Sequence, residues 1–210
     1  KQFLTFLTVV FITATTFAQA NLSISSGASV TIDPLASITL PGNLTVTSGS
    51  SLTVAHTASF VQTQDAATVT NNGAISVLVD TPELNVRDFV IMGSPTNAET
   101  REGVWGTSSV VNKHTTTDFT TYENPLNPIE GYNFYDSDVN DWSATSGILF
   151  PGEGYLVRPQ AQVEGEGGVF NYDFNTGALN TGVITYTLDF NSDPGGPESS
   201  PSVLSNPYPS

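Results

Sequence analysis

The sequence predicts an all-β protein, in which a short parallel β-solenoid of about three coils precedes an antiparallel β-sandwich or jelly-roll-like domain. Gly, Pro, Ser, Thr and Asn are abundant and long helical patterns are absent. Two similar twelve-residue stretches, identical at six positions, lie 22 residues apart. Further along, short apolar runs alternate with turn residues, which is typical of sandwich folds. We therefore divide the chain into residues 1–20, 21–85 and 86–210.

The first 20 residues have the pattern of a secretory signal peptide. Lys1 supplies a positive charge, Phe3 to Phe17 is an uncharged apolar run, and Ala18-Gln19-Ala20 is a small-x-small cleavage signal. The apolar run is shorter than the roughly 18 to 20 residues that a membrane-spanning helix needs. We therefore expect cleavage before Asn21, export of the remaining chain, and no membrane span after cleavage.

The repeated phrase predicts the solenoid. "NLSISSGASVTI" begins at Asn21, "NLTVTSGSSLTV" begins at Asn43, and a looser third copy, "ATVTNNGAISV", begins at Ala67. Apolar and polar residues alternate within each copy, and turn residues separate its two strands. One coil cannot bury its own apolar face, so neighbouring coils must repeat it. The expected inward ladders are Leu22–Leu44–Ala67, Ile24–Val46–Val69 and Val30–Leu52–Ile75.

Two alternatives accompany this interpretation. A meander of antiparallel hairpins would show the same alternation, but the near-constant period favours the solenoid. The outward residues would form two columns of hydroxyl groups, as some ice-binding solenoids do. Thr is also a common strand residue, and this plainer explanation is the one we favour. The two columns are Ser23–Thr45–Thr68 and Ser25–Thr47–Thr70.

In residues 86–210 the repeat ends and aromatic residues become frequent. The predicted strands lie within "DFVIMGSP" from Asp88, "GYNFYDSDVNDWSA" from Gly131, "PGEGYLVRP" from Pro151, "GGVFNYDF" from Gly167 and "GVITYTLDF" from Gly182. The last stretch, "SPSVLSNPYPS", begins like a strand and ends in a proline-rich turn. We expect the natural chain to continue beyond Ser210, so that this second domain is truncated at its C-terminal end.

The order of these motifs resembles that in secreted surface proteins of Bacteroidetes bacteria. The similar stretches are "FVIMGSP", "FYDSDVNDW", "PGEGYLV", "FNTGALNTGVITYTL" and "LSNPYPS", and together they cover nearly all of the chain after the leader. Ser205 departs from the glycine that is usual in the last motif. The resemblance implies a cell-surface protein of the kind that ends in a sorting domain for type IX secretion, here as an N-terminal fragment. It implies no catalytic residues.

The charge balance excludes several partners. The chain has 20 acidic and 5 basic residues, with a formal net charge of −15. Nucleic-acid binders need clustered Lys and Arg, so nucleic acid is excluded, and an anionic membrane surface would repel the chain. The chain has no Cys. Its stability must therefore come from burial of apolar surface, with no contribution from disulfides.

Residues for catalysis are few. His56 and His114 are the two histidines, and neither has the close-range His, Glu or Cys spacing of a metal site. There is no G-x-S-x-G motif. A glycosidase needs a pair of carboxylates. Glu153, Glu164 and Glu166 are candidates by residue type, but they lie in Gly-rich turns where solvated acids are common. The sequence therefore predicts no catalytic residue and no cofactor.

Two binding sites are candidates. Asp136, Asp138 and Asn140 follow the start of a calcium loop, D-x-D-x-N, but Asp141 then replaces the expected Gly, so a hairpin turn explains them better. Trp105 and Trp142 can form a surface on which sugars stack, although aromatic residues in a Cys-free sandwich more often form its core.

We expect a secreted or cell-surface structural or adhesion protein without catalytic activity, with extracellular glycans or surface components as partners. The alternative is the carbohydrate-binding module region of a larger extracellular enzyme.

Overall fold

The structure, a computed structural model, describes residues 20–118, 141–161, 166–189 and 202–209. These residues are almost entirely β. The elements of the first region are β1 (Leu22–Ile24), β2 (Ser29–Ile32), β3 (Ser37–Leu40), β4 (Leu44–Val46), β5 (Ser51–Val54), β6 (Ser59–Gln62), β7 (Val69–Asn71) and β8 (Ala74–Asp80). Those that follow are β9 (Val90–Met92), α1 (Arg101–Val104), β10 (Val110–His114), the 3-10 helix η1 (Thr116–Asp118), β11 (Trp142–Ala144), β12 (Tyr155–Arg158) and β13 (Asn171–Phe174).

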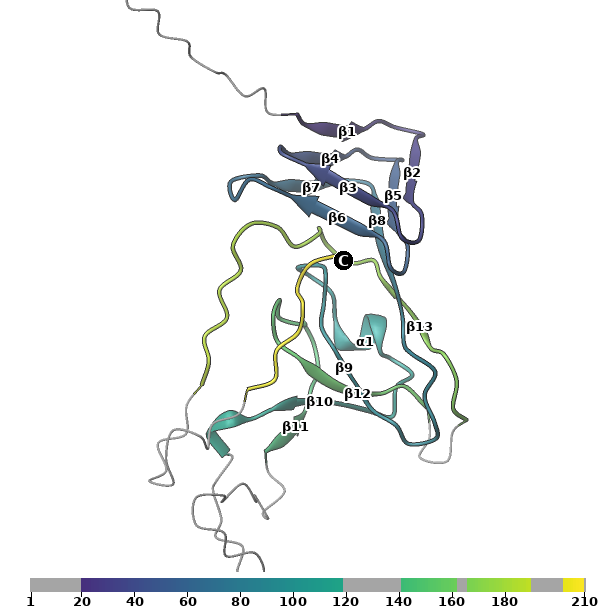
Figure 1. Cartoon of the computed structure of the whole chain (residues 1–210), viewed down its shortest axis with the longest axis vertical. Helices are drawn as coiled ribbons and strands as arrows, with labels where there is room; N and C mark the ends of the chain where they lie inside the picture. The colour runs from purple at the N-terminus through teal and green to yellow at the C-terminus, as the bar shows by residue number, and fades with distance from the viewer. Residues whose placement is uncertain (1–19, 119–140, 162–165, 190–201, 210) are drawn as a thin grey trace, which may run out of the picture.

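Strands β1 to β8 form a stack of parallel pairs (Figure 1). The pairs run in the orders β1-β4-β7, β2-β5-β8 and β3-β6. We call this unit the parallel stack. Its first layer is β1 to β3, its second layer is β4 to β6, and its third layer is β7 and β8. Partners in the first two layers lie 22 residues apart, as for Leu22 with Leu44, so this part of the predicted register is confirmed.

Two kinds of residue in the repeated phrase, its first Asn and its turn Gly, have the same role in successive layers. The Asn21 Oδ1 accepts the backbone N–H of Asn43 at 2.8 Å, and the Asn43 Oδ1 accepts that of Thr68 at 2.9 Å. Gly27 and Gly49 form equivalent turns at φ 80° and 76°, a conformation that costs glycine little. The N–H of Gly27 donates to the carbonyl of Gly49 at 3.0 Å, which aligns the two turns.

The third layer enters the stack two residues later than the sequence predicts. Val69 pairs with Leu44, and Asn71 pairs with Val46, whereas the predicted partners were Ala67 and Val69. The loop from β6 to β7 is longer than the loop from β3 to β4, which displaces β7. The turn from β7 to β8 is shorter than its counterpart from β4 to β5, and β8 returns to the predicted pairing with β5.

The same displacement changes the outward columns. Thr70, and not Thr68, stands beside Thr45 in the column that begins at Ser23. The Thr47 hydroxyl, which the sequence places in a second column, donates to the Ile24 carbonyl at 2.9 Å and so stabilises the contact between layers.

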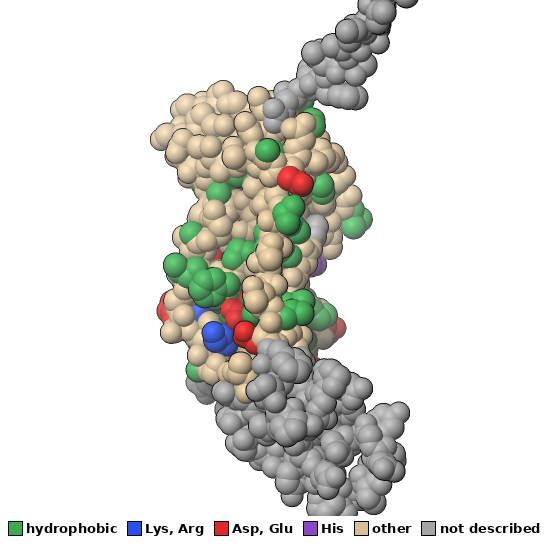
Figure 2. All heavy atoms as spheres, turned by 90° about the vertical axis from the view of Figure 1, so that its left-hand side faces the viewer, with side chains coloured by type: hydrophobic (Ala, Val, Ile, Leu, Met, Phe, Trp, Pro, Cys, Tyr) green, Lys and Arg blue, Asp and Glu red, His purple; other side chains and the backbone are tan. Residues whose placement is uncertain are grey.

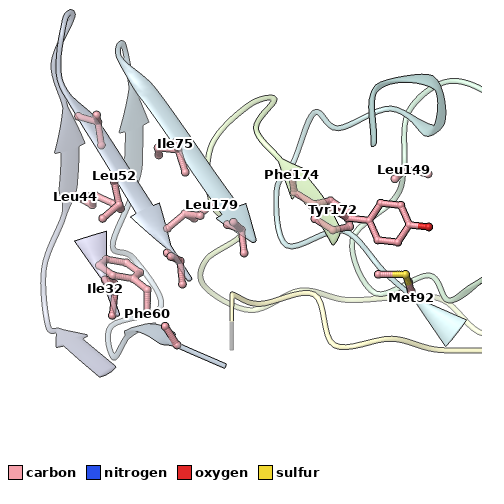
Figure 3. Packing of buried hydrophobic residues seen from close by; sticks show 14 of the residues in the cluster. Ile32, Leu44, Leu52, Phe60, Ile75, Met92, Leu149, Tyr172, Phe174 and Leu179 are labelled. Atoms are coloured by element: carbon pink, nitrogen blue, oxygen red, sulfur yellow. The ribbon is translucent and has the colours of Figure 1, made fainter. Parts of the chain in front are cut away.

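Strand β8 joins the parallel stack to the second region. Its residues Ala74 to Val77 pair in parallel with β5, and its residues Val77 to Asp80 pair antiparallel with β13. The resulting sheet has the order β13-β8-β5-β2. A single cluster of buried apolar side chains therefore continues from Leu52 in the stack to Phe174 on β13 (Figure 3).

The second region contains an antiparallel sheet of order β11-β10-β12-β9. Strands β9, β11, β12 and β13 lie in stretches that the sequence predicts as strands. The sequence does not predict β10, because "VVNKH" lacks a clear apolar alternation. It does not predict α1 either, which Thr100 caps by accepting the Gly103 N–H on its side-chain oxygen at 3.0 Å.

The chain itself covers the lower end of the parallel stack, on the side of the third layer (Figure 1). The Asn71 Nδ2 donates to the Gly177 carbonyl at 2.6 Å, and the Phe60 N–H donates to the Pro209 carbonyl at 2.9 Å. Leu179 is buried. The segment at Gly177 to Leu179 and the segment at Pro209 thus close this end.

One predicted strand does not form. The described part of "GVITYTLDF", residues 182–189, belongs to no sheet among the described residues. Its start is fixed by two contacts: the Asn180 N–H donates to the Pro95 carbonyl at 2.9 Å, and the Tyr208 hydroxyl donates to the Gly182 carbonyl at 2.7 Å. Its alternating apolar residues favour an extended chain, but a strand also needs a hydrogen-bonded partner.

Candidate functional site

A groove of about 720 Å³ lies between the lower end of the parallel stack and the second region. We call it the Glu153 groove. Polar and apolar groups share its walls, and the segment 184–187 forms one side of it. Its lining residues are Ala67, Thr68, Val69, Asn97, Lys113, Phe150, Pro151, Glu153 and residues 178–181 and 184–187.

Glu153 is buried at the base of this groove and holds two tyrosines. Its Oε2 accepts a hydrogen bond from the Tyr155 hydroxyl, and its Oε1 accepts one from the Tyr186 hydroxyl at 3.4 Å. The Tyr155 oxygen in turn accepts the Phe150 N–H at 2.8 Å. The Glu153 backbone carbonyl accepts the Ser205 hydroxyl at 2.7 Å. One residue thus ties together three segments that are distant in the sequence.

The environment of the cluster raises the pKa of both tyrosines. Burial, and then the hydrogen bond to Glu153, raise the pKa of Tyr155 above its ordinary value. Burial, and then the charge of Glu153, raise the pKa of Tyr186. Each hydroxyl is a donor at neutral pH, as in any tyrosine, and the raised pKa extends this range to more alkaline pH.

The sequence interpretation of Glu153 as a solvated loop acid is wrong, since only 8% of the residue is exposed. A usable signal was present: Glu153, Tyr155 and Val157 alternate in phase, and all three are buried. Glu166 is exposed, as expected of a loop acid, and Glu164 lies outside the described residues. Of the two members that the structure describes, Glu153 lines the groove and Glu166 does not.

The rim of the groove exposes an aromatic ring. Phe150 is 60% exposed, and Tyr186 lies half-buried in the same wall. Lys113 and Asn97 add an ammonium and an amide to the lining. An apolar ring surrounded by amide, hydroxyl and charged groups can bind a polar ligand by stacking and hydrogen bonding.

A second buried carboxylate, Glu99, is 1% exposed and binds backbone. Its Oε1 accepts the Thr100 N–H at 2.9 Å, and its Oε2 accepts the N–H groups of Asn175 and Thr176 at 2.9 and 3.1 Å. These bonds fix the turn after β13 against the start of α1. Sequence reasoning missed this residue, because its partners are backbone groups that no pattern of side chains marks.

The structure separates the two predicted sugar-stacking residues. Trp105 is fully buried, and its ring packs against Tyr155, Tyr172 and Phe174 with centroids 5.6, 6.5 and 5.9 Å away. No face of this ring reaches the surface, so Trp105 has the core position that the sequence favours for such aromatic residues and does not stack on a glycan. Trp142 is half-buried on β11, edge-on to His114 with ring centroids 5.1 Å apart.

The remaining predicted site residues have plain positions. The His56 Nδ1 accepts the Asp80 N–H at 3.1 Å, which fixes the end of β8. Asp136, Asp138 and Asn140 lie outside the described residues. So does the leader, apart from Ala20. Within the described ranges, no three His, Cys, Asp or Glu residues gather as a metal site, and neither helix is long and apolar enough to cross a membrane.

Comparison with known protein families gives a match over nearly the whole chain. A family model described as a domain of unknown function, DUF8693, matches residues 5–210. The chain belongs to this family. The match extends over both the parallel stack and the second region, so one family model covers the two together. Among curated proteins and solved structures, none matches the chain.

Proposed function

We propose that this member of the DUF8693 family is a secreted, cell-surface structural or adhesion protein without catalytic activity. The observation that supports the absence of catalysis is the use of its two buried carboxylates. Glu99 and Glu153 are the described acids that burial would best suit to acid–base chemistry, yet both oxygens of each are occupied by donors of the chain itself. A carboxylate that exchanges a proton with a substrate must instead reach that substrate.

The pattern of the sequence supports the remainder of the proposal. The apolar leader with its Ala18-Gln19-Ala20 signal supports export. The order of motifs that resembles Bacteroidetes surface proteins supports sorting by type IX secretion. In this proposal the parallel stack is a short β-solenoid, and the second region is a sandwich-like domain. Together they extend from the cell surface.

Export and surface exposure are tested on intact cells of the source organism. An antibody against the parallel stack should label unpermeabilised cells, and external protease should remove the signal. N-terminal sequencing of the exported protein should begin at Asn21. Retention inside the cell with Lys1 in place would overturn the proposal.

The absence of catalysis is tested with Glu153→Gln. A panel of polysaccharides and peptides should show no turnover by the native protein. Turnover that Glu153→Gln abolishes, while the variant keeps its melting temperature, would show that this carboxylate does chemistry and would refute the proposed role.

A second candidate function is carbohydrate binding at the Glu153 groove, and the exposed ring of Phe150 favours it. A glycan array read with native protein and Phe150→Ala tests it. Ile148→Ala is the matched control, because Ile148 is 56% exposed two residues away but does not line the groove. Binding lost in the first variant and kept in the second supports a sugar site. Binding kept in both, or absent throughout, removes this candidate.

A further inference from the structure

The two ends of the parallel stack differ. The lower end is covered by residues 177–182 and by Pro209, as described above. At the upper end, among the described residues, β1, β2 and β3 each have a strand partner on one side only. The first layer therefore ends in an open row of backbone N–H and C=O groups.

The exposed fractions of the inward apolar side chains show how much of that end is uncovered. Leu44 and Leu52 in the second layer are 0% exposed, and Phe60 is 4% exposed. Their partners one layer higher occupy the same ladder positions but are only partly buried. These partners are Leu22, Val30 and Ile38. The other inward residues of the first layer, Ile24, Ile32 and Leu40, are already buried. The incomplete burial is therefore confined to Leu22, Val30 and Ile38, and a further layer would complete it.

The open edge lacks the features that usually prevent pairing. Natural edge strands carry charges, proline or bulges that repel another strand. The strands "LSI", "SVTI" and "SITL" contain no charged residue and no proline. Asp33 and Pro34 lie in the turn between β2 and β3, so the charge and the proline of the first layer stand outside its strands, whose residues are small hydroxyl and apolar side chains.

Charge favours a second copy of the chain at this edge. Of the 20 acidic residues, only Asp33 and Asp65 precede Asp80, so nearly all of the net negative charge lies in the second region. The face in Figure 2 shows the same contrast, with few charged side chains on the stack and more of them below it. Two acidic chains can therefore approach through their stacks with little repulsion.

The covered lower end determines how two copies can meet. Head-to-tail stacking would need the third layer to be open, and the chain's own segments occupy it. We propose that two copies associate head to head through their first layers, related by a twofold axis. Strands of one first layer then pair antiparallel with those of the other, and Leu22, Val30 and Ile38 of both copies become buried. Such an isologous contact is closed, so the product is a dimer and not a filament.

Sedimentation velocity of the exported chain, from about 1 to about 100 μM, tests the dimer. We expect a monomer–dimer equilibrium. Val30→Lys should weaken it at least about tenfold, because the ammonium enters the paired edge. Thr53→Lys is the matched control: it adds the same charge on the outward face of the second layer, and dimerisation should persist. A monomer at every concentration, or a dimer equally stable in a folded Val30→Lys variant, would overturn the proposal.

Hydrogen exchange of the native protein gives a readout that needs no variant. Amides of β1, β2 and β3 should exchange faster on dilution, while those of β4 and β12 should not change. Concentration-dependent protection located elsewhere would refute the head-to-head contact. This inference does not depend on the proposed surface role: a monomer that still labels intact cells would remove the dimer alone.

Discussion

Val46→Asp is the sharpest test of the register in the parallel stack. Val46 is 0% exposed on β4, where Ile24 and Asn71 flank it in the ladder. Thr45, its neighbour in sequence, points the opposite way and is partly exposed. The same carboxylate introduced at the two positions should therefore have very different consequences for the free energy of unfolding.

The magnitude follows from two contributions. Loss of a buried valine side chain costs about 1.5 to 3 kcal/mol. The carboxylate adds a desolvation cost, because residues 21–86 contain no Lys or Arg to pair with it. Together they destabilise the fold by about 3 to 5 kcal/mol at pH 7, a large part of the roughly 5 to 15 kcal/mol that holds a domain. Thr45→Asp should cost less than about 1 kcal/mol.

Urea unfolding followed by circular dichroism measures both variants, with Val46→Ala as the control that removes apolar contacts without adding charge. Burial should raise the pKa of the new Asp above its unfolded value of about 4. Below that value the acid is neutral in both states, so Val46→Asp and Val46→Ala should differ least there. The difference in stability between the two variants should widen as the pH rises from about 4 toward the raised pKa, and should be constant above it. Equal midpoints for the Asp variants at 45 and 46 would refute the register.

Three further predictions concern other parts of the chain. Trp105→Ala should destabilise the fold by about 3 to 5 kcal/mol, since it empties the centre of an aromatic cluster, while Trp142→Ala at a partly exposed edge should cost about 1 kcal/mol; urea midpoints compare them. Burial raises the pKa of Tyr155. The stability that its protonated hydroxyl contributes is therefore complete below the unfolded pKa of about 10 and is lost as the pH rises toward the folded pKa. Tyr155→Phe should flatten the decline in melting temperature above about pH 10. Calorimetry should detect no tight calcium site, because the loop at Asp136 lacks the Gly and the terminal Glu of a calcium loop, and micromolar binding abolished by Asp138→Ala would contradict this.

The sequence was informative wherever one residue has the same task in each layer. The Asn21 and Asn43 side chains bridge successive layers, and their 22-residue spacing predicted the pairing of the first two layers. It did not predict the start of β7, for a physical reason. A shift of two residues keeps every inward residue inward, so apolar alternation gives no warning of it. Only Asn71, a polar residue in an inward position, marks the change.

Buried polar groups explain what was missed at the candidate site. Glu99 and Glu153 are buried with part of their hydrogen bonding supplied from far along the chain: the N–H groups of Asn175 and Thr176 meet Glu99, and the Tyr186 hydroxyl meets Glu153. A single sequence shows the acid but not those donors. Trp105 is similar: whether a tryptophan lies in the core or on the surface depends on which strands surround it, and its own neighbours in sequence are consistent with either.

The segment 182–189 shows most directly why local pattern and fold can differ. Its alternation is as regular as that of β5, yet β5 lies between two strands, and this segment has none among the described residues. Propensity selects an extended backbone, but the hydrogen-bonded partner decides whether that backbone is a strand. The first layer is the intermediate case, with a partner on one side only. If its open edge binds a second copy, the contact is the same one that joins the layers within one chain, used once more between two chains.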